Sequence, residues 1–266
     1  MKLVTTIPAY NEQDALAGVI AEIPRQIAGI EVVQVLVVDD GSSDSTVEIA
    51  KKAGADKVLS HERNEGLGVA FRDGLEAALE MGADIIVNID ADGQYDATEI
   101  PKLIGPILDN KADVVLGWRD VDTLGFMPRG KKIGNRVATW FTRTLSGLPI
   151  KDAQTGFRAF SKEAALRLEL AATYTYVQET LIQAKYHGLR IAQVPVNFRE
   201  REGESRLIRS VYSYALRAGP AMFSAYWHYH LQPFILGLFA PRLKKRRLHR
   251  EEAAYVLRRQ KTGTGR

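Results

Sequence analysis

The segment 90–94 (DADGQ) places two carboxylates, Asp90 and Asp92, one residue apart and directly after a predicted buried strand at 84–89. Ligands of open α/β sheets bind beyond the carboxyl ends of the strands. Two carboxylates buried side by side repel each other unless a cation or a proton holds them. Their oxygens favour Mg²⁺ or Mn²⁺, which can bridge the diphosphate of a nucleotide-sugar. The alternative is a solvated turn at a strand end, since Asp-x-Asp alone is common.

A second acidic pair, Asp39 and Asp40, follows the nearly continuous Val/Leu run at 32–38 and precedes a predicted helix. A carboxylate at this position can accept hydrogen bonds from a nucleobase or from ribose hydroxyls. Helix capping is the alternative. It would account for Ser43 or Asp44, but not for two consecutive aspartates at the strand end.

The first predicted strand, residues 2–7, runs into the sequence PAYNE at 8–12. Tyr10 offers an aromatic face to a nucleobase, and Glu12 an acceptor to ribose or metal-bound water, with Asn11 as a helix N-cap the alternative. If these strands are neighbours, five carboxylates converge on one edge of the sheet: Glu12, Asp39, Asp40, Asp90 and Asp92. Their mutual repulsion requires a cation, so we expect a metal–nucleotide site.

Predicted strands and helices alternate along the first 118 residues. We expect strands at 2–7, 32–38, 57–59, 84–89 and 113–116, and helices at 12–27, 45–52, 67–81 and 97–108. A loop at 119–130 then precedes helices at 131–145, 162–170 and 177–186 and strands at 157–160 and 190–196. The alternation predicts an α/β fold with a mainly parallel sheet flanked by helices on both faces.

The composition is that of a globular protein with a well-filled core. Of the 266 residues, 45% are hydrophobic and 26% are charged, so we do not expect extensive disorder. The absence of cysteine excludes disulfides and thiolate metal sites. The N-terminus begins a strand and shows no secretory signal, so we expect the active domain in the cytoplasm.

The C-terminal part of the sequence has the composition of a membrane-binding segment. Residues 242–266 hold ten Lys/Arg and two Glu, a net charge of +8, so the total of +4 leaves −4 for residues 1–241. A basic tail suits anionic lipid headgroups, and no aromatic-plus-basic module points to nucleic acid. Residues 218–241 carry no charged side chain, but prolines and histidines interrupt them. This favours an amphipathic helix on the cytoplasmic face of the membrane over a span, with packing on the protein's own core as the alternative.

We therefore divide the chain into a catalytic domain at 1–206, an amphipathic interfacial helical segment at 207–241 and a basic tail at 242–266.

Six segments of the sequence together resemble family 2 of the inverting glycosyltransferases. In chain order they are PAYNE, VDDGSSDST, NEGLG, DADGQ, TGFRAF and VPVNFREREGESR. That family has the GT-A (Rossmann-like) fold. The resemblance is greatest to dolichyl-phosphate mannose synthases and other polyprenyl-phosphate glycosyltransferases.

The resemblance implies a role for each matching residue. The nucleotide-sugar would be held by Pro8, Tyr10, Glu12, Val37, Asp39, Asp40, Asp90, Ala91, Arg201 and Arg206. The metal, Mg²⁺ or Mn²⁺, would be held by Asp90, Asp92 and Gln94, and the catalytic residues would be Asp92 and Arg119. The acceptor phosphate would be held by Arg119, Lys131, Asn135 and Arg136. Lys131 and Asn135 stand where relatives have an arginine and a serine, and Arg206 stands where they often have lysine.

The implied reaction moves a hexose from a nucleotide-sugar to a polyprenyl (dolichyl or undecaprenyl) phosphate with inversion. A phosphate acceptor is already anionic near neutral pH, so it needs positioning but no general base, and a metal can stabilise the leaving diphosphate. The donor stays open among GDP-mannose, UDP-glucose and UDP-N-acetylglucosamine. Two other functions also stay open: a soluble family 2 transferase with a hydroxyl acceptor, and a non-catalytic module that binds nucleotide or membrane.

Overall fold

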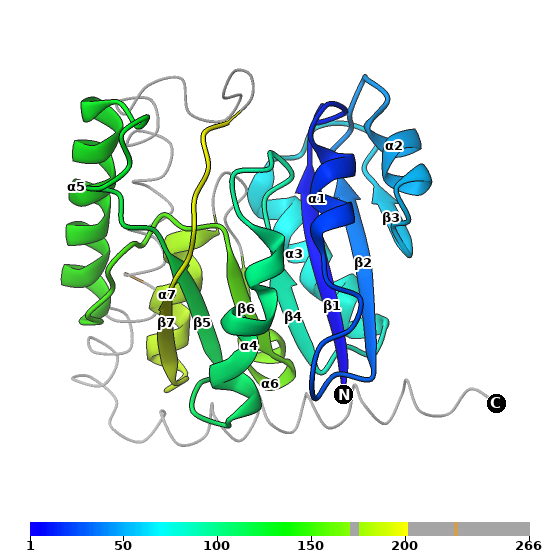
Figure 1. Cartoon of the computed structure of the whole chain (residues 1–266). Helices are drawn as coiled ribbons and strands as arrows, with labels where there is room; N and C mark the ends of the chain where they lie inside the picture. The colour runs from blue at the N-terminus through cyan, green and yellow to red at the C-terminus, as the bar shows by residue number, and fades with distance from the viewer. Residues whose placement is uncertain (171–175, 202–226, 228–266) are drawn as a thin grey trace. The chain divides into compact units, whose positions relative to one another are not determined.

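The computed structural model describes residues 1–170, 176–201 and 227 (Figure 1). The chain divides into two units, residues 1–222 and 223–266, and all the elements below lie in the first. Its strands are β1 (Lys2–Ala9), β2 (Val32–Asp39), β3 (Lys57–Ser60), β4 (Ile85–Asn88), β5 (Val114–Trp118), β6 (Arg158–Ser161) and β7 (Ile191–Pro195). They form one sheet in the order β3-β2-β1-β4-β6-β5-β7.

Helices cover both faces of the sheet, which is why the central strands consist of apolar residues with little alternation. One face packs against α1 (Leu16–Glu22), α2 (Thr46–Lys52) and α4 (Ile100–Leu108), the last preceded by the short 3-10 helix η1 (Ala97–Glu99). The other face packs against α3 (Leu67–Glu80), α6 (Lys162–Arg167) and α7 (Val177–Tyr186). The long helix α5 (Arg129–Ser146) contacts α7 at one side of the sheet (Figure 1). The expected α/β fold with a mainly parallel sheet is confirmed.

The predicted helix at 12–27 is wrong in its extent, because α1 ends at Glu22. Ile23 has an extended backbone with ψ of 117°, and Pro24 follows it. The residue before a proline is disfavoured in the helical region, so the chain leaves the helix there. Ile23 and Ile27 are nevertheless buried, so the apolar spacing that suggested a longer helix comes from core contacts made after the helix has ended.

One strand runs against the others, and this positions the site. β6 is antiparallel to both of its neighbours, β4 and β5, whereas the other strand pairs of the sheet are parallel. The start of β6 therefore lies at the edge of the sheet where β4 and β5 end. The segment 152–157, which leads into β6, is brought to the same edge as Asp90, Asp92 and Arg119.

Some predictions fall outside the described residues. Arg206, the interfacial segment 207–241 apart from Trp227, and the tail 242–266 belong to this group and stay predictions. Among the helices in the described part of the chain, none has the length and apolar character needed to cross a membrane.

Candidate active site

Asp90 and Asp92 follow β4, where burial opposes the ionisation of both side chains. Burial raises the pKa of Asp90 to about 7, and the negative charge of Asp92 adds to this shift. Burial also raises the pKa of Asp92. A Cβ atom on Gly156 would lie 2.5 Å from Asp90 Oδ1, so only glycine leaves room for this carboxylate. Two desolvated carboxylates fit a hard divalent cation, which would supply the charge they lack.

Arg201 contacts a predicted donor-binding residue, Glu12, and a predicted metal ligand, Asp92. Its Nη2 lies 2.6 Å from Glu12 Oε1, and its Nη1 lies 3.1 Å from Asp92 Oδ2. The other oxygen of Asp92 accepts a hydrogen bond of 3.1 Å from the backbone N–H of Gln94. The structure therefore brings Glu12 and Arg201, predicted to hold the nucleotide-sugar, together with Asp92, predicted to hold the metal.

The segment that carries Arg201 is fastened to the loop after β4. The backbone N–H of Arg199 donates to the carbonyl of Gln94 over 2.7 Å, and Gln94 Nε2 donates to the carbonyl of Arg199 over 3.2 Å. The Arg199 guanidinium also pairs with Glu22 and Asp96 at 2.7 and 2.9 Å. The side-chain nitrogen of Gln94 thus holds this segment in place, and the predicted metal contact of Gln94 stays a prediction.

The aspartates after β2 have other partners. Asp40 accepts hydrogen bonds from the backbone N–H groups of Glu65 and Gly66, at 2.8 and 2.9 Å, and its Oδ1 lies 2.8 Å from His61 Nδ1. Asp39 Oδ1 accepts one from the backbone N–H of Ser42 at 3.2 Å. Asp40 therefore anchors the loop between β3 and α3.

The expectation that all five carboxylates converge on one ion is wrong. Across residues 1–170, 176–201 and 227, no three His, Asp or Glu side chains are grouped so that they could hold a metal ion. Asp40 binds the next loop because its oxygens accept hydrogen bonds from backbone N–H groups there. Among the five carboxylates, Asp90 and Asp92 stay the candidate metal ligands, with the predicted contact of Gln94 beside them.

The remaining donor residues lie at the ends of adjacent strands. β1 and β2 pair in parallel with Ile7 opposite Val37, so Pro8 and Val37 are both buried next to this edge. Tyr10, just beyond β1, is 38% exposed and can present its ring to a base. Ala91, between the two aspartates, is buried. The order β2-β1-β4 confirms that these strand ends are neighbours.

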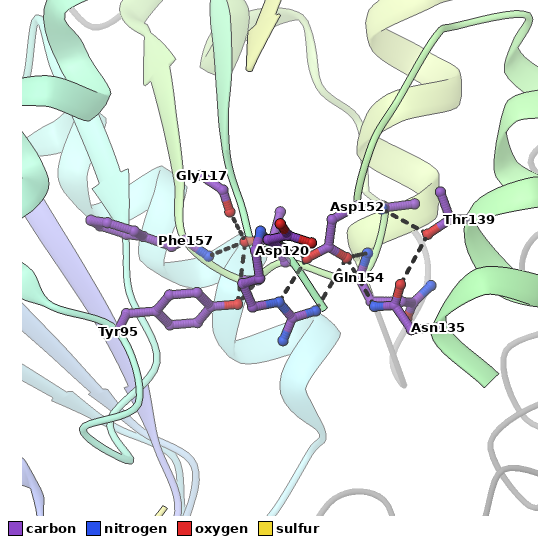
Figure 2. Close-up of polar contacts among 12 residues, drawn as sticks. Tyr95, Gly117, Asp120, Asn135, Thr139, Asp152, Gln154 and Phe157 are labelled. Atoms are coloured by element: carbon purple, nitrogen blue, oxygen red, sulfur yellow. Dashed lines mark hydrogen bonds and ion pairs between the residues drawn. The ribbon is translucent and has the colours of Figure 1, made fainter. Parts of the chain in front are cut away.

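Arg119 directly follows β5 and forms a two-point ion pair with Asp152. Figure 2 labels Asp152 among its polar contacts. Arg119 Nε lies 2.6 Å from Asp152 Oδ2, and Nη2 lies 3.2 Å from Oδ1. Asn135, from α5, donates to the same Oδ1 over 3.0 Å. Burial disfavours both charges, but the pairing outweighs it and raises the pKa of Arg119 while it lowers that of Asp152. The ring of Phe198 packs against the guanidinium of Arg119, with 4.8 Å between the ring centroid and Arg119 Cζ.

Asp152 is the site residue that the sequence interpretation missed. Its signal in the sequence is slight, a lone aspartate a few residues before the TGFRAF segment. The antiparallel β6 is what brings it beside β5.

Of the four predicted acceptor residues, the structure brings two together at one carboxylate. Arg119 and Asn135 meet at Asp152. Lys131 is exposed on α5, and Arg136 forms an exposed ion pair of 2.6 Å with Asp122.

The profile of "Glycosyl transferase family 2" matches residues 5–168. The chain belongs to this family. A dolichyl-phosphate N-acetylglucosaminyltransferase that uses UDP-N-acetylglucosamine, from Methanococcus voltae, is 36% identical over 71% of this chain and 82% of its own length. A dolichyl-phosphate hexose transferase from Haloferax volcanii is 36% identical over 77% of this chain and 86% of its own length.

Solved structures of a glycosyltransferase share the fold. Glucosyl-3-phosphoglycerate synthase from Mycobacterium tuberculosis, in complex with Mn²⁺, UDP and glucosyl-3-phosphoglycerate, has a TM-score of 0.66. The likeness covers 85% of this chain and 79% of the other at 22% identity, so it shows the GT-A fold alone. Family membership makes this chain a glycosyltransferase, and the strand ends described above are its candidate active site.

Proposed function

We propose that this glycosyltransferase moves a hexose from a nucleotide-sugar to a polyprenyl phosphate with inversion, at the cytoplasmic face of a membrane. The observation that carries the proposal is the place of Arg119, a buried cation between two acidic groups. It pairs with Asp152 on the side of α5, and its charge also acts on Asp90 after β4. A cation so placed can meet the acceptor phosphate next to the donor diphosphate. The dolichyl-phosphate transferases among the relatives support the same acceptor.

A divalent metal fits the donor side. Asp90 and Asp92 would hold Mg²⁺ or Mn²⁺, because burial leaves both carboxylates short of positive charge. When bound, the ion would neutralise the charge that develops on the leaving diphosphate. Arg201, already 3.1 Å from Asp92, supplies a second positive charge for the diphosphate.

On the acceptor side, the side chains favour a phosphate over a hydroxyl. A hydroxyl acceptor needs a general base, and such a base works best with a pKa near the working pH. Of the two buried carboxylates near Arg119, Asp90 is assigned here to the metal. The other, Asp152, has a lowered pKa, and its oxygens accept hydrogen bonds from Arg119 and Asn135. It is therefore a poor base. A phosphate needs none, and the N–H groups of Arg119 and Asn135 suit its oxygens.

A donor panel tests this function. Radiolabelled GDP-mannose, UDP-glucose and UDP-N-acetylglucosamine would each be incubated with the protein and a short polyprenyl phosphate, with and without Mn²⁺. We expect one donor to give a lipid-linked sugar that requires the metal. A polyprenol without its phosphate is the matched control and should receive no sugar. Transfer to the free alcohol, or to a soluble glycoside but not to the phosphate, would contradict the proposal.

Helix α5 supports the proposed membrane contact, because its polarity is the reverse of that of an ordinary surface helix. Its buried residues are Thr139, Thr142 and Ser146, whereas Ile133, Val137, Trp140 and Phe141 are between 43% and 63% exposed. The helix also carries five Lys/Arg and no acidic residue. Apolar and aromatic side chains beside basic ones suit the interface of an anionic bilayer.

We therefore expect the protein to co-sediment with vesicles that contain anionic lipid, and less so at high salt because salt screens the attraction. Replacing Trp140 and Val137 by serine should reduce the bound fraction by about tenfold, since both exposed apolar side chains would become buried in the bilayer. Serine at the exposed Tyr186 on α7 is the control and should bind as the unsubstituted protein does. Recovery of all the protein in the supernatant at low salt would contradict a membrane-bound enzyme.

A further inference from the structure

The acceptor side of the site is organised by Asp152, a residue to which no role has been given so far. Its carboxylate is 1% exposed, and two of its partners, Arg119 after β5 and Asn135 on α5, come from different elements. The backbone N–H groups of Gln154 and Arg119 also donate to it, at 3.0 and 3.4 Å. Such a buried carboxylate fixes the groups that donate to it, because each loses a strong hydrogen bond if it moves.

The network extends beyond Asp152 and fixes the orientation of the Asn135 amide (Figure 2). Asn135 Nδ2 donates to Asp152, and its Oδ1 accepts from the hydroxyl of Thr139 at 3.4 Å. The Thr139 hydroxyl in turn accepts from the backbone N–H of Ala153 at 3.1 Å. The amide of Asn135 is thus held at both ends, by Asp152 directly and by Ala153 through the hydroxyl of Thr139.

Arg119 and Asn135 have more N–H groups than those that bond to Asp152, and these can donate to a ligand beside it. A guanidinium has five N–H groups, and Asp152 takes two of those of Arg119, on Nε and Nη2. Asn135 has a second N–H besides the one given to Asp152. Because Nη2 of Arg119 and Nδ2 of Asn135 both bond to Oδ1, these nitrogens lie at most about 6 Å apart. Two donors at that separation can reach two oxygens of a single phosphate group.

We propose that Asp152 is a positioning residue that aligns Arg119 and Asn135 as a two-point clamp on the acceptor phosphate. The inference rests on the proposed polyprenyl-phosphate function and adds the residue that builds its acceptor subsite. The donor side does not depend on this clamp, because Asp92, Glu12 and Arg201 are held by contacts of their own.

The test is the Asp152→Asn variant, which keeps the size of the side chain and removes its charge. We expect the KM for a short polyprenyl phosphate to rise by about tenfold or more, and its direct binding, followed by tryptophan fluorescence without donor, to weaken equally. The affinity for the nucleoside diphosphate with Mn²⁺ should stay unchanged. Asp113→Asn is the matched control, since Asp113 pairs with Arg190 at 2.8 Å beside the start of β5. It should alter neither constant.

If Asp152→Asn does not fold, Thr139→Val is the second variant. It removes the hydrogen bond from the Thr139 hydroxyl to the Asn135 amide and leaves the ion pair of Asp152 with Arg119 intact. It should raise the same KM to a smaller degree. An unchanged acceptor KM in the folded variants, or an equal loss of nucleoside diphosphate binding, would overturn the positioning role while the proposed function stands. If the unsubstituted protein neither binds nor glycosylates the polyprenyl phosphate, both proposals fall.

Discussion

The Asp92→Asn variant should fold as the unsubstituted protein does and transfer sugar at least about 10³-fold more slowly. The substitution would withdraw one of the two negative charges that the metal needs after β4, so the leaving diphosphate would lose its counter-charge. The fold should be spared, because burial raises the pKa of Asp92 and its ionised form is costly to keep there. Single-turnover transfer and Mn²⁺ titration measure the loss, and the Tm shows that the variant is folded.

The matched control for this prediction is Asp84→Asn, at the opposite end of the same strand. Asp84 accepts a hydrogen bond of 2.8 Å from the backbone N–H of Lys2 and lies far along β4 from the candidate metal ligands. It should keep full activity and full Mn²⁺ affinity. Unchanged turnover in Asp92→Asn would remove the metal role from this residue and, with it, the main chemical argument for the donor site.

The largest effect on stability is expected for Arg158→Met. The Arg158 side chain is fully buried, and it donates to the carbonyls of Ala153, Thr155 and Val177 at 3.0, 2.9 and 2.8 Å. Methionine would remove that donor from the three carbonyls and from the hydroxyl of Thr180, although the Val177 carbonyl keeps its hydrogen bond from Thr180. Each buried group left unsatisfied costs about 1–3 kcal/mol. We expect a loss of about 3–5 kcal/mol and a Tm lower by about 10 °C, measured by denaturant and thermal unfolding.

Arg190→Met is the control for this loss, because Arg190 is an exposed arginine whose ion pair with Asp113 is open to solvent. Exposed pairs contribute little, so the Tm of that variant should fall much less. A similar fall in both variants would show that the buried hydrogen bonds of Arg158 do not stabilise the segment 153–155. That segment adjoins Asp152, so the folded fraction of Arg158→Met should also bind the acceptor less well.

Most helices and strands could be predicted from the sequence, because the burial of each element is visible in the pattern of its own apolar residues. A strand covered on both faces must be apolar throughout, and the runs at 32–38 and 84–89 indicated β2 and β4 for that reason. The exception was the helix at 12–27, where buried Ile23 and Ile27 mimicked helical spacing although Pro24 ends helix α1. Periodicity reports which residues are buried, and a local backbone restriction can override the helix that it suggests.

For the candidate site too, local features could be predicted from the sequence, whereas contacts between distant segments could not. The pair Asp90 and Asp92, Arg119 and their positions at strand ends follow from the sequence, since residue type and place after a buried strand are local properties. The partners of these residues are decided by contacts between distant segments. Asp40 binds the loop at 61–66, Arg201 reaches Glu12, and Asp152 stands beside Arg119 because β6 is antiparallel. Strand direction and side-chain pairing depend on the packing of the whole domain, so only the tertiary structure determined which charges meet.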